Sequence, residues 1–301
     1  MPALLALVAV TAVWGLTFVQ VKDAVALYPL LAFLAVRFGI ASLALGVPGV
    51  CRAWRLGRAG WAAAALLGLL LAGGYVLQTY GLERTSVSNA GFVTGMYVVL
   101  TPVLALALFG LRIPASAWGG VALATLGLAL LAGVERGSAA GDLLVLGGAA
   151  VFALQIVLME RYAPRFDALG FTFVEMLAAF AVLLVVAAPS LEVPRGWTVW
   201  SALIVTGVFA SALAFLVQMW AQRRTSATRT ALVFALEPVW AAFFGFTLAG
   251  DRLGPVAWAG CAVIMAGILL AEPAAGDALA RLVGRARRPA ARGSDPPKDL
   301  L

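Results

Sequence analysis

Long apolar segments follow one another along almost the whole chain, with only short polar stretches between them. We place ten such segments at residues 3–21, 29–49, 60–80, 87–109, 115–134, 141–159, 168–188, 198–220, 229–249 and 254–271. Each is apolar on all sides and is bounded by charged residues, Pro or Gly. A helix needs about 20 apolar residues to cross a bilayer, whereas membrane-barrel strands are shorter and alternate in polarity. The pattern therefore predicts an all-α membrane protein with ten transmembrane helices.

The composition points to the same class and leaves no room for a large soluble domain. Of the 301 residues, 63% are hydrophobic and 12% are charged, whereas soluble domains have about 45–50% apolar and about 25% charged residues. The chain has no His, and its two Cys follow no pairing pattern. It also contains no phosphate-binding loop and no hydrolase or metal motif. We therefore expect no catalytic residue, no metal and no cofactor.

The basic residues predict how the chain is oriented in the membrane. A net charge of +7 can indicate nucleic-acid binding, but here the Lys and Arg lie in the loops and in the last 30 residues. Arg37, inside a predicted span, is the exception. With a cytoplasmic N-terminus and alternating segments, the other basic residues favour the cytoplasmic side by about three to one. We expect a multi-pass protein of the cell (inner) membrane, with both termini cytoplasmic and no nucleic-acid partner. Residues 272–301 read as a basic, disordered cytoplasmic tail.

The second half of the chain repeats the first. Gln78–Thr85 aligns with Gln218–Thr225, and Trp118–Gly127 aligns with Trp258–Gly267 at the same offset. We therefore divide the chain into repeats at 3–134 and 141–271. Five spans is an odd number, so the second repeat must enter the membrane from the opposite side. Such inverted five-helix repeats are typical of secondary transporters, whose substrate site lies between the repeats in a central cavity.

Several short motifs carry a resemblance to a known family. They are Trp14-Gly15 with Phe18, Lys22 and Pro29; Ala35-Val36-Arg37-Phe38; Ser88-Asn89-Ala90 with Thr101-Pro102; and Leu236-Glu237-Pro238-Val239 with Gly250-Asp251-Arg252-Leu253. In this order they resemble the EamA domain of the drug/metabolite transporter superfamily, with Asp251 where Glu is more usual. The resemblance implies ten helices and a cavity lined mainly by spans 1–4 and 6–9, with spans 5 and 10 at the periphery. Members export or exchange amino acids, nucleotide sugars, other metabolites or toxic compounds.

Three charged residues fall inside the predicted spans. Arg37, Glu175 and Glu237 would each cost about 2.5–3.5 kcal/mol at the bilayer centre. In a functional interpretation they line a polar cavity, where Arg37 pairs with an acid or with an anionic group of a substrate. The two glutamates are then also candidates for carrying protons. In the alternative interpretation they form a structural ion pair that locks two helices together.

Uncharged polar and aromatic residues add to this set of candidates. Ser211, Phe215 and Gln218 lie at helical spacing on one face of span 8, and Tyr75 and Gln78 occupy matching places in span 3. The full set of substrate-binding candidates is Trp14, Thr17, Phe18, Arg37, Tyr75, Gln78, Asn89, Tyr97, Gln155, Glu175, Ser211, Phe215, Gln218 and Glu237. Hydrogen bonding between helices, without a role in binding, is the alternative for the uncharged members.

Small residues and prolines predict packing and bending. Gly91 and Gly95 form a GxxxG step in span 4, and the glycines of span 5 recur in span 10. We interpret both as close helix packing. Pro102 and Pro238 occupy matching places in spans 4 and 9, where each could serve as a hinge.

These features lead to one preferred function and several alternatives. We expect a secondary active transporter, acting as an exporter of a small polar or amphiphilic metabolite such as an amino acid or related compound. An importer or exchanger of the same fold is the nearest alternative. A membrane-embedded enzyme would need clustered catalytic residues that the sequence lacks, and a structural or receptor-like protein would not need buried charges. The expected partners are a small-molecule substrate and the lipid bilayer, and no oligomeric state follows from the sequence.

Overall fold

The computed structural model describes residues 2–82, 84–85, 87–132, 138–244, 246–247 and 253–271. This part of the chain is helical and contains no strand. The helices are α1 (Pro2–Val25), α2 (Leu30–Ala53), η1 (Trp54–Leu56), α3 (Gly57–Leu82), α4 (Val87–Gly95), α5 (Tyr97–Phe109), α6 (Ala115–Ala132), α7 (Ala139–Tyr162), α8 (Ala168–Ala187), η2 (Ala188–Ser190), α9 (Trp197–Gly207), η3 (Val208–Leu213), α10 (Ala214–Gln222), α11 (Ala227–Phe234), α12 (Glu237–Phe244) and α13 (Pro255–Ala271). The predicted tail at 272–301 and Asp251 lie outside the described residues.

Many of these helical segments have the length and the apolar composition needed to cross a membrane. Six segments of the described chain are long and apolar enough to cross a bilayer, and their mean hydropathy lies between 1.7 and 2.4. They are Leu30–Leu82, Ala90–Phe109, Ala115–Ala132, Ala139–Tyr162, Ala168–Ser190 and Trp197–Gln222. The first contains both α2 and α3, and two shorter apolar helices occupy Pro2–Thr17 and Pro255–Ala271. Helix lies over every predicted stretch, but the number of crossings stays a prediction.

Four of the predicted stretches are interrupted rather than continuous. In the stretch at 29–49 the interruption is a kink of α2 at Gly46, whose φ of 42° is not helical. The stretch at 87–109 is divided into α4 and α5 by a tighter turn, in which Val99 N donates to Met96 O. The stretch at 198–220 contains a π-helical turn, η3. The stretch at 229–249 is divided into α11 and α12 just before Pro238. Proline has no N–H and is tolerated in the first turn of a helix, so a new helix begins there.

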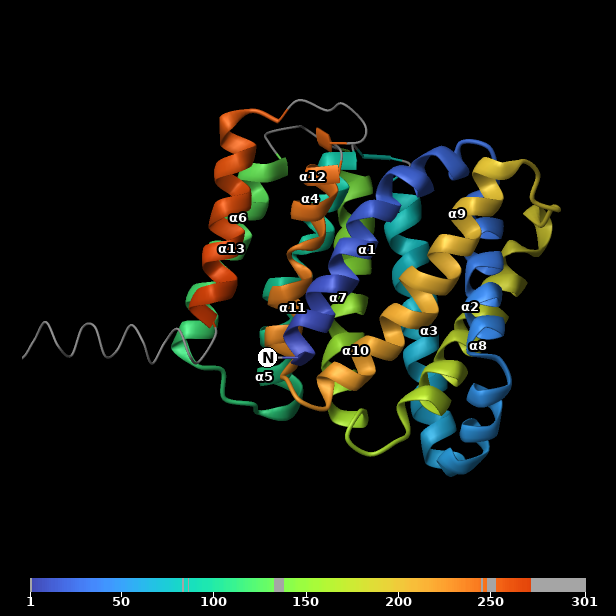
Figure 1. Cartoon of the computed structure of the whole chain (residues 1–301). Helices are drawn as coiled ribbons and strands as arrows, with labels where there is room; N and C mark the ends of the chain where they lie inside the picture. Colours follow the sequence, from blue (N-terminus) through green and yellow to red (C-terminus); the bar gives the residue numbers. More distant parts are fainter. Residues whose placement is uncertain are drawn as a thin grey trace, which may run out of the picture.

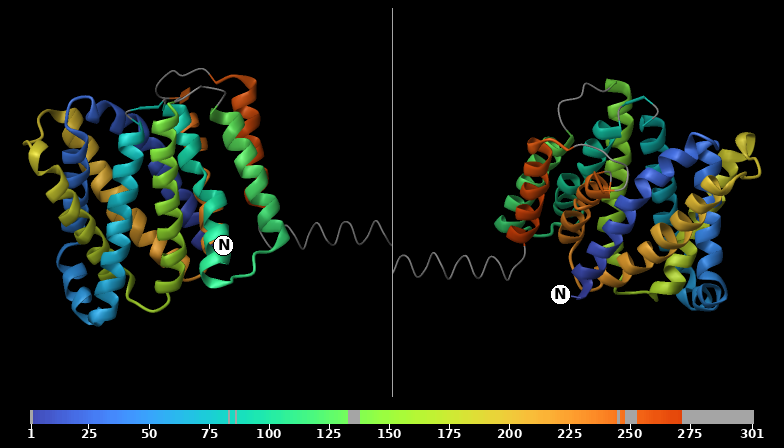
Figure 2. Two further views of the ribbon diagram at one scale, coloured as in Figure 1. Left: turned by 180° about the vertical axis from the view of Figure 1, so that it is seen from behind. Right: turned by 45° about the horizontal axis from the view of Figure 1, so that its top comes forward.

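The helices form an elongated bundle with a separate pair at one edge (Figure 1). At that edge α6 and α13 lie side by side in both views of Figure 2. A Cβ added at Gly127 would lie 2.7 Å from Gly260 O, and one added at Gly120 would lie 2.6 Å from Gly267 O. The predicted glycine packing of these two helices is therefore confirmed. Gly91 was wrongly included in this interpretation, since no atom lies within 4 Å of its Cβ position.

Two apolar cores hold the bundle together. One contains large buried side chains of α2, α3 and α8, such as Phe38, Leu67 and Phe171. The other joins α1, α5, α7, α11 and the α6–α13 pair. Trp14 of α1 packs against both cores. The junction between the two cores is where a cavity can form without exposing either core.

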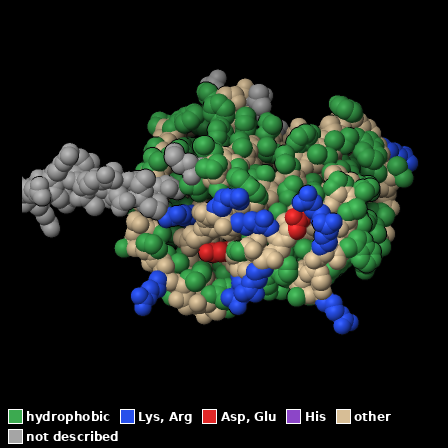
Figure 3. All heavy atoms as spheres, turned by 60° about the horizontal axis from the view of Figure 1, so that its bottom comes forward, with side chains coloured by type: hydrophobic (Ala, Val, Ile, Leu, Met, Phe, Trp, Pro, Cys, Tyr) green, Lys and Arg blue, Asp and Glu red, His purple; other side chains and the backbone are tan. Residues whose placement is uncertain are grey.

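The outer surface has the character of a lipid-facing one. Leu43, Val47 and Val185 have 80%, 74% and 75% of their surface exposed. Exposing apolar side chains is unfavourable in water but not in the hydrocarbon of a bilayer. At the end of the bundle that holds the N-terminus, Figure 3 shows a face where Lys and Arg side chains gather with fewer acidic ones. Charged groups lie at this end because their burial in hydrocarbon is costly.

Candidate functional site

A cavity of about 810 Å³ lies between the two cores. Its walls come from α1, α2, α3, α4, α5, α7, α10, α11 and α12, while α6 and α13 contribute nothing to the described lining. It reaches the end of the bundle where α1 and α3 end and α4 begins, through Asp23, Val25, Leu82 and Ala90. This is the end opposite the N-terminus in Figure 1. Asp23 is exposed at the mouth of the cavity.

Most of the candidates from the sequence lie on these walls. Ten of the fourteen line the cavity: Trp14, Thr17, Arg37, Tyr75, Gln78, Tyr97, Gln155, Phe215, Gln218 and Glu237. Ser211 and Glu175 are fully buried behind the wall. The side chains of Phe18 and Asn89 lie outside the described part of the structure. A role in binding stays a prediction for all fourteen residues.

Arg37 is held on α2 by neutral acceptors and by a ring. Its Nε donates to Ser211 Oγ at 2.8 Å, and its Nη2 donates at 3.4 Å to both Tyr75 Oη and Ala210 O. The guanidinium carbon lies 5.0 Å from the centre of the Tyr75 ring, a cation–π distance. The expected pairing of Arg37 with an acid does not occur among the described residues. The reason is that polar oxygens of the π-helical turn reach the guanidinium instead.

The π-helical turn η3 builds this support. Ala210 O accepts from the Trp14 indole at 2.8 Å as well as from Arg37, so one backbone carbonyl joins α1, α2 and span 8. The turn can approach α2 closely because a Cβ at Gly207 would lie only 2.7 Å from Ile40 Cγ2. π-helical turns are rare and occur often at functional sites. The sequence suggested Ser211 but contained no signal for the carbonyl.

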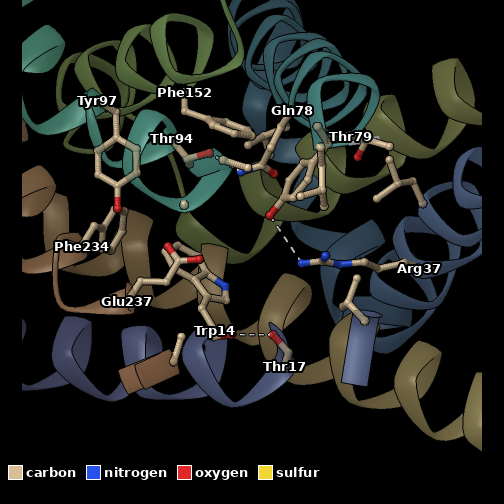
Figure 4. Close-up of a pocket in the computed structure, with 18 of the residues that line it drawn as sticks. Trp14, Thr17, Arg37, Gln78, Thr79, Thr94, Tyr97, Phe152, Phe234 and Glu237 are labelled. Carbon is tan, nitrogen blue, oxygen red and sulfur yellow. Dashed lines mark hydrogen bonds between the residues drawn. The ribbon is translucent and has the colours of Figure 1, made fainter. Parts of the chain in front are cut away.

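Glu237 lies at the start of α12, where the chain resumes its helix after the break. Its side chain is half-buried, lines the cavity, and accepts no hydrogen bond from any described group. The N-terminus of a helix favours a negative charge. Figure 4 shows Glu237 and Arg37 on facing sides of the cavity, with Trp14 between them. The two opposite charges therefore share one space without forming an ion pair.

Aromatic rings form much of the remaining wall. The Trp14 ring lies 4.8 Å from that of Phe234 in an edge-to-face arrangement, and 5.9 Å from that of Phe215. Across the cavity, the Tyr75 ring lies 5.2 Å from Phe152. Phe152 was missed in the sequence, although it lies one helical turn before Gln155 and so shares its face. Rings of this kind bind flat apolar groups and, through their faces, cations.

Amides and hydroxyls supply the polar part of the lining. Gln78 Nε2 donates to Thr94 Oγ1 at 3.0 Å and so links α3 to α4. Thr94 was also missed, because a Thr in an apolar helix carries little signal by itself. The Gln218 amide donates to Gln155 Oε1 at 3.1 Å and to Gln222 Oε1 at 2.9 Å. These contacts place a polar strip on the wall formed by α7 and α10.

The cavity has the size and the lining of a small-molecule site. Among the described residues, no group of three or more His, Cys, Asp or Glu comes together. The cavity volume falls within the range of about 300–1,000 Å³ that is usual for small-molecule sites. A mixed lining of rings, amides and two opposite charges suits an amphiphilic polar ligand.

Comparisons with known proteins point to one family. The model of the EamA-like transporter family matches residues 1–133 and again residues 139–271. An uncharacterized transporter of Archaeoglobus fulgidus is 31% identical over 269 residues, which is 88% of this chain and 84% of that protein. The uncharacterized inner membrane transporter YedA of Escherichia coli K12 is 27% identical over 277 residues, 90% of each chain. A crystal structure at 19% identity aligns with a TM-score of 0.78 over 92% of this chain and 98% of the other, and it supports the fold.

Proposed function

The chain belongs to the EamA-like transporter family, and on that premise we propose that it is a secondary active transporter that exports a small polar or amphiphilic metabolite by alternating access. It is a multi-pass membrane transporter whose relatives are named as transporters. The observation that carries the proposal is the presence of Arg37 and Glu237 in one aromatic cavity without an ion pair between them. A pair that locked two helices would be in contact.

The topology we propose is ten crossings in two inverted repeats, at 3–134 and 141–271. The family model matches the chain twice, with a boundary between residues 133 and 139. Contacts of α6 and α13 are reciprocal: a Cβ added at Gly127 would lie 2.7 Å from Gly260 O, and one added at Gly260 would lie 2.7 Å from Gly127 O. The stretches at 87–109 and 229–249 correspond in the two repeats, and both are interrupted. Each of these features is expected of two copies of one five-helix unit.

We propose that the protein lies in the inner membrane with both termini in the cytoplasm. The relative YedA is named as an inner membrane transporter. The end of the bundle that holds the N-terminus carries the basic face of Figure 3, as the positive-inside rule requires of a cytoplasmic side. With this orientation the cavity faces outward.

Alternating access requires that the cavity be closed on one side and that the walls can move. On the side of the N-terminus it is closed by buried apolar residues of α1 and α11, including Leu7, Ala231 and Leu232. The broken stretches contribute Thr94 and Tyr97 on one side of the cavity and Phe234 and Glu237 on another. Breaks in a helix are where rigid segments can rotate, so these two stretches are the hinges we propose.

The substrate class we propose is a small molecule with one positive and one negative group, such as an amino acid or a related compound. Its anionic group would approach Arg37 and its cationic group Glu237, while apolar parts would contact Trp14 and Phe215. Because the two charges lie on facing sides of the cavity, a ligand with both would satisfy each of them. A ligand with one charge would leave the other unpaired.

Counterflow in proteoliposomes tests the function directly. The purified protein is loaded with an unlabelled compound, and uptake of its labelled form is followed across a panel of amino acids, amines, carboxylic acids and nucleotides. We expect exchange of at least one zwitterion, and a strong loss of that exchange in Glu237→Gln. The matched control is Glu192→Gln, an exposed loop glutamate, which should leave the rate unchanged. A folded protein that exchanges no compound would overturn the proposal, as would equal rates in both variants.

A further inference from the structure

A carboxyl group lies behind the cavity wall that the proposed substrate site does not use. Glu175 of α8 has no exposed surface. Its Oε1 accepts from Gln155 Nε2 at 2.9 Å, while its Oε2 is buried and has no hydrogen-bond partner among the described residues. A carboxylate oxygen that is buried and left without a donor is unusual, since it has lost water and gained nothing.

Among the residues that the structure describes, no positive charge compensates Glu175. The charged and titratable groups on the elements that pack against α8, and on α7, are Arg37, Cys51, Arg52, Arg55, Arg58, Tyr75, Tyr80, Asp142, Glu160, Arg161 and Tyr162; α10, η2 and η3 carry none. None of them has a hydrogen bond or an ion pair with Glu175. Arg37 turns toward Ser211 and Tyr75, and Arg52 pairs with Asp167 at 3.1 Å. An isolated buried carboxylate is so costly that the group takes up a proton instead.

One of the neighbouring glutamine amides also has an oxygen that receives no hydrogen bond from a described residue. Gln218 uses its nitrogen to bond both Gln155 and Gln222, and Gln222 donates to Ile156 O at 2.8 Å. Gln218 Oε1 is buried and accepts nothing. The cluster of Glu175, Gln155, Gln218 and Gln222 thus contains two acceptor atoms that receive no hydrogen bond within the described chain, and it has no hydroxyl group that could donate one. The two atoms are Glu175 Oε2 and Gln218 Oε1. One added proton would turn Glu175 from an acceptor into a donor.

We propose that Glu175 is a proton-binding site in this conformation, separate from the substrate-contacting wall, and that Gln155 links it to the cavity. The proton comes from a hydronium ion: one of its O–H bonds breaks, an O–H bond forms at Oε2, a water molecule is released, and the charge of the carboxyl group changes from −1 to zero. Gln155 and Gln218 line the cavity, whereas Glu175 does not. A single side chain therefore separates the proton from a ligand in the cavity.

The coupling follows from the hydrogen bond of Gln155 and rests on the proposed function. A charged carboxylate binds an amide N–H more strongly than a neutral carboxyl group does. Protonation of Glu175 thus changes how firmly Gln155 is held, and with it the polar surface that a ligand meets. By thermodynamic reciprocity, a ligand that contacts Gln155 changes the proton affinity by the same factor.

Infrared spectroscopy of the purified full-length protein tests proton occupancy without any substrate. We expect a protonated-carboxyl band at neutral pH that disappears in Glu175→Gln and persists in Glu237→Gln and Glu192→Gln. Gln is nearly isosteric with Glu and uncharged, and a melting temperature close to that of the parent protein is the control that the variant is folded. A band that persists in Glu175→Gln, or no band in the parent protein, would overturn the site. A sodium-dependent rise in melting temperature that Glu175→Gln abolishes would also overturn it, since a metal cation would then be the ligand.

Proteoliposomes with an imposed pH gradient test the coupling. We expect the gradient to change the transport rate of the parent protein and to leave the rate of Glu175→Gln unchanged. Equal parent rates with and without the gradient would overturn the coupling and leave transport itself standing. Absence of all transport would instead count against the proposed function, while the infrared result would still decide the proton site.

Discussion

Replacing Ser211 by Ala should destabilise the protein by removing the best hydrogen bond of a buried cation. The bond from Arg37 Nε to Ser211 Oγ is 2.8 Å long, and Arg37 is 6% exposed. The other two contacts of Arg37, both at 3.4 Å, are too long to replace it. The substitution leaves the guanidinium in place with an unsatisfied N–H, which is costlier than removing both partners together.

The magnitude follows from the type of bond. A hydrogen bond to a charged group contributes about 1.5–3 kcal/mol to the free energy of unfolding. For a chain of this size that corresponds to a fall of about 3–10 °C in the melting temperature. The change from Ser to Ala removes one oxygen, so the volume of any new cavity is small. The loss of the hydrogen-bond acceptor is therefore the main contribution to the change in the free energy of unfolding.

Thermal unfolding of purified protein at one fixed scan rate measures the effect. The matched control is Ser42→Ala, which removes another buried serine hydroxyl whose bond is only to Phe38 O in its own helix, at 2.9 Å. A local bond of this kind contributes little to stability. We expect the Ser42 variant to melt close to the parent protein and the Ser211 variant well below both.

A double-mutant cycle shows whether the effect passes through Arg37. In an Arg37→Met background no guanidinium remains, so Ser211→Ala should cost no more than Ser42→Ala. Equal melting temperatures for the two serine variants in the parent protein would refute the reasoning. So would an unchanged cost of the Ser211 substitution in the Arg37→Met background.

Three further predictions test other parts of the structure. Glu237→Gln should weaken ligand binding by about tenfold or more, as expected for the loss of a charge-assisted contact. The melting temperature should stay unchanged, because the carboxylate accepts no described hydrogen bond. A large fall in the melting temperature would contradict this prediction. Gly127→Ala should destabilise the α6–α13 pair by about 1–3 kcal/mol, since its Cβ would lie 2.7 Å from the α13 backbone. The control is Gly73→Ala, whose Cβ would have no atom within 4 Å. This control should be neutral or stabilising when both variants are compared by thermal unfolding. Glu160→Ala should cost about 1 kcal/mol, because Glu160 Oε2 accepts from Ala227 N at 2.7 Å at the start of α11 and Ala has no acceptor to replace it. Hydrogen exchange at α11 measures the loss, and unchanged protection would count against this contact.

The positions of helix could be predicted well because lipid leaves the backbone few options. In hydrocarbon every N–H and C=O must be paired within the protein, and a helix pairs them locally. Apolar runs such as 115–134 therefore predict helix, and α6 occupies Ala115–Ala132. The breaks were not predicted with equal precision. Pro238 marks one of them, but neither the turn at Met96 nor the π-helical turn carries a comparable signal.

The candidate site could be predicted in its members but not in its contacts. Polar residues in an apolar span must point into the bundle, so Arg37 and Gln218 could be selected as candidates. Their partners depend on helices far apart in the chain. Arg37 meets a serine and a carbonyl of span 8 rather than an acid, and Gly91 faces the cavity rather than a neighbouring helix.

The membrane environment of this protein, its helical class and the small set of polar groups that hydrocarbon cannot accommodate could all be predicted from the amino-acid sequence. The reason is that these properties depend on composition and on local hydrogen bonding. The three-dimensional packing was needed to learn which of those groups share a cavity, as Arg37 and Glu237 do, and which lie behind its wall, as Glu175 does. That division depends on the rotation and crossing of whole helices, which are set by the packing of all their faces at once.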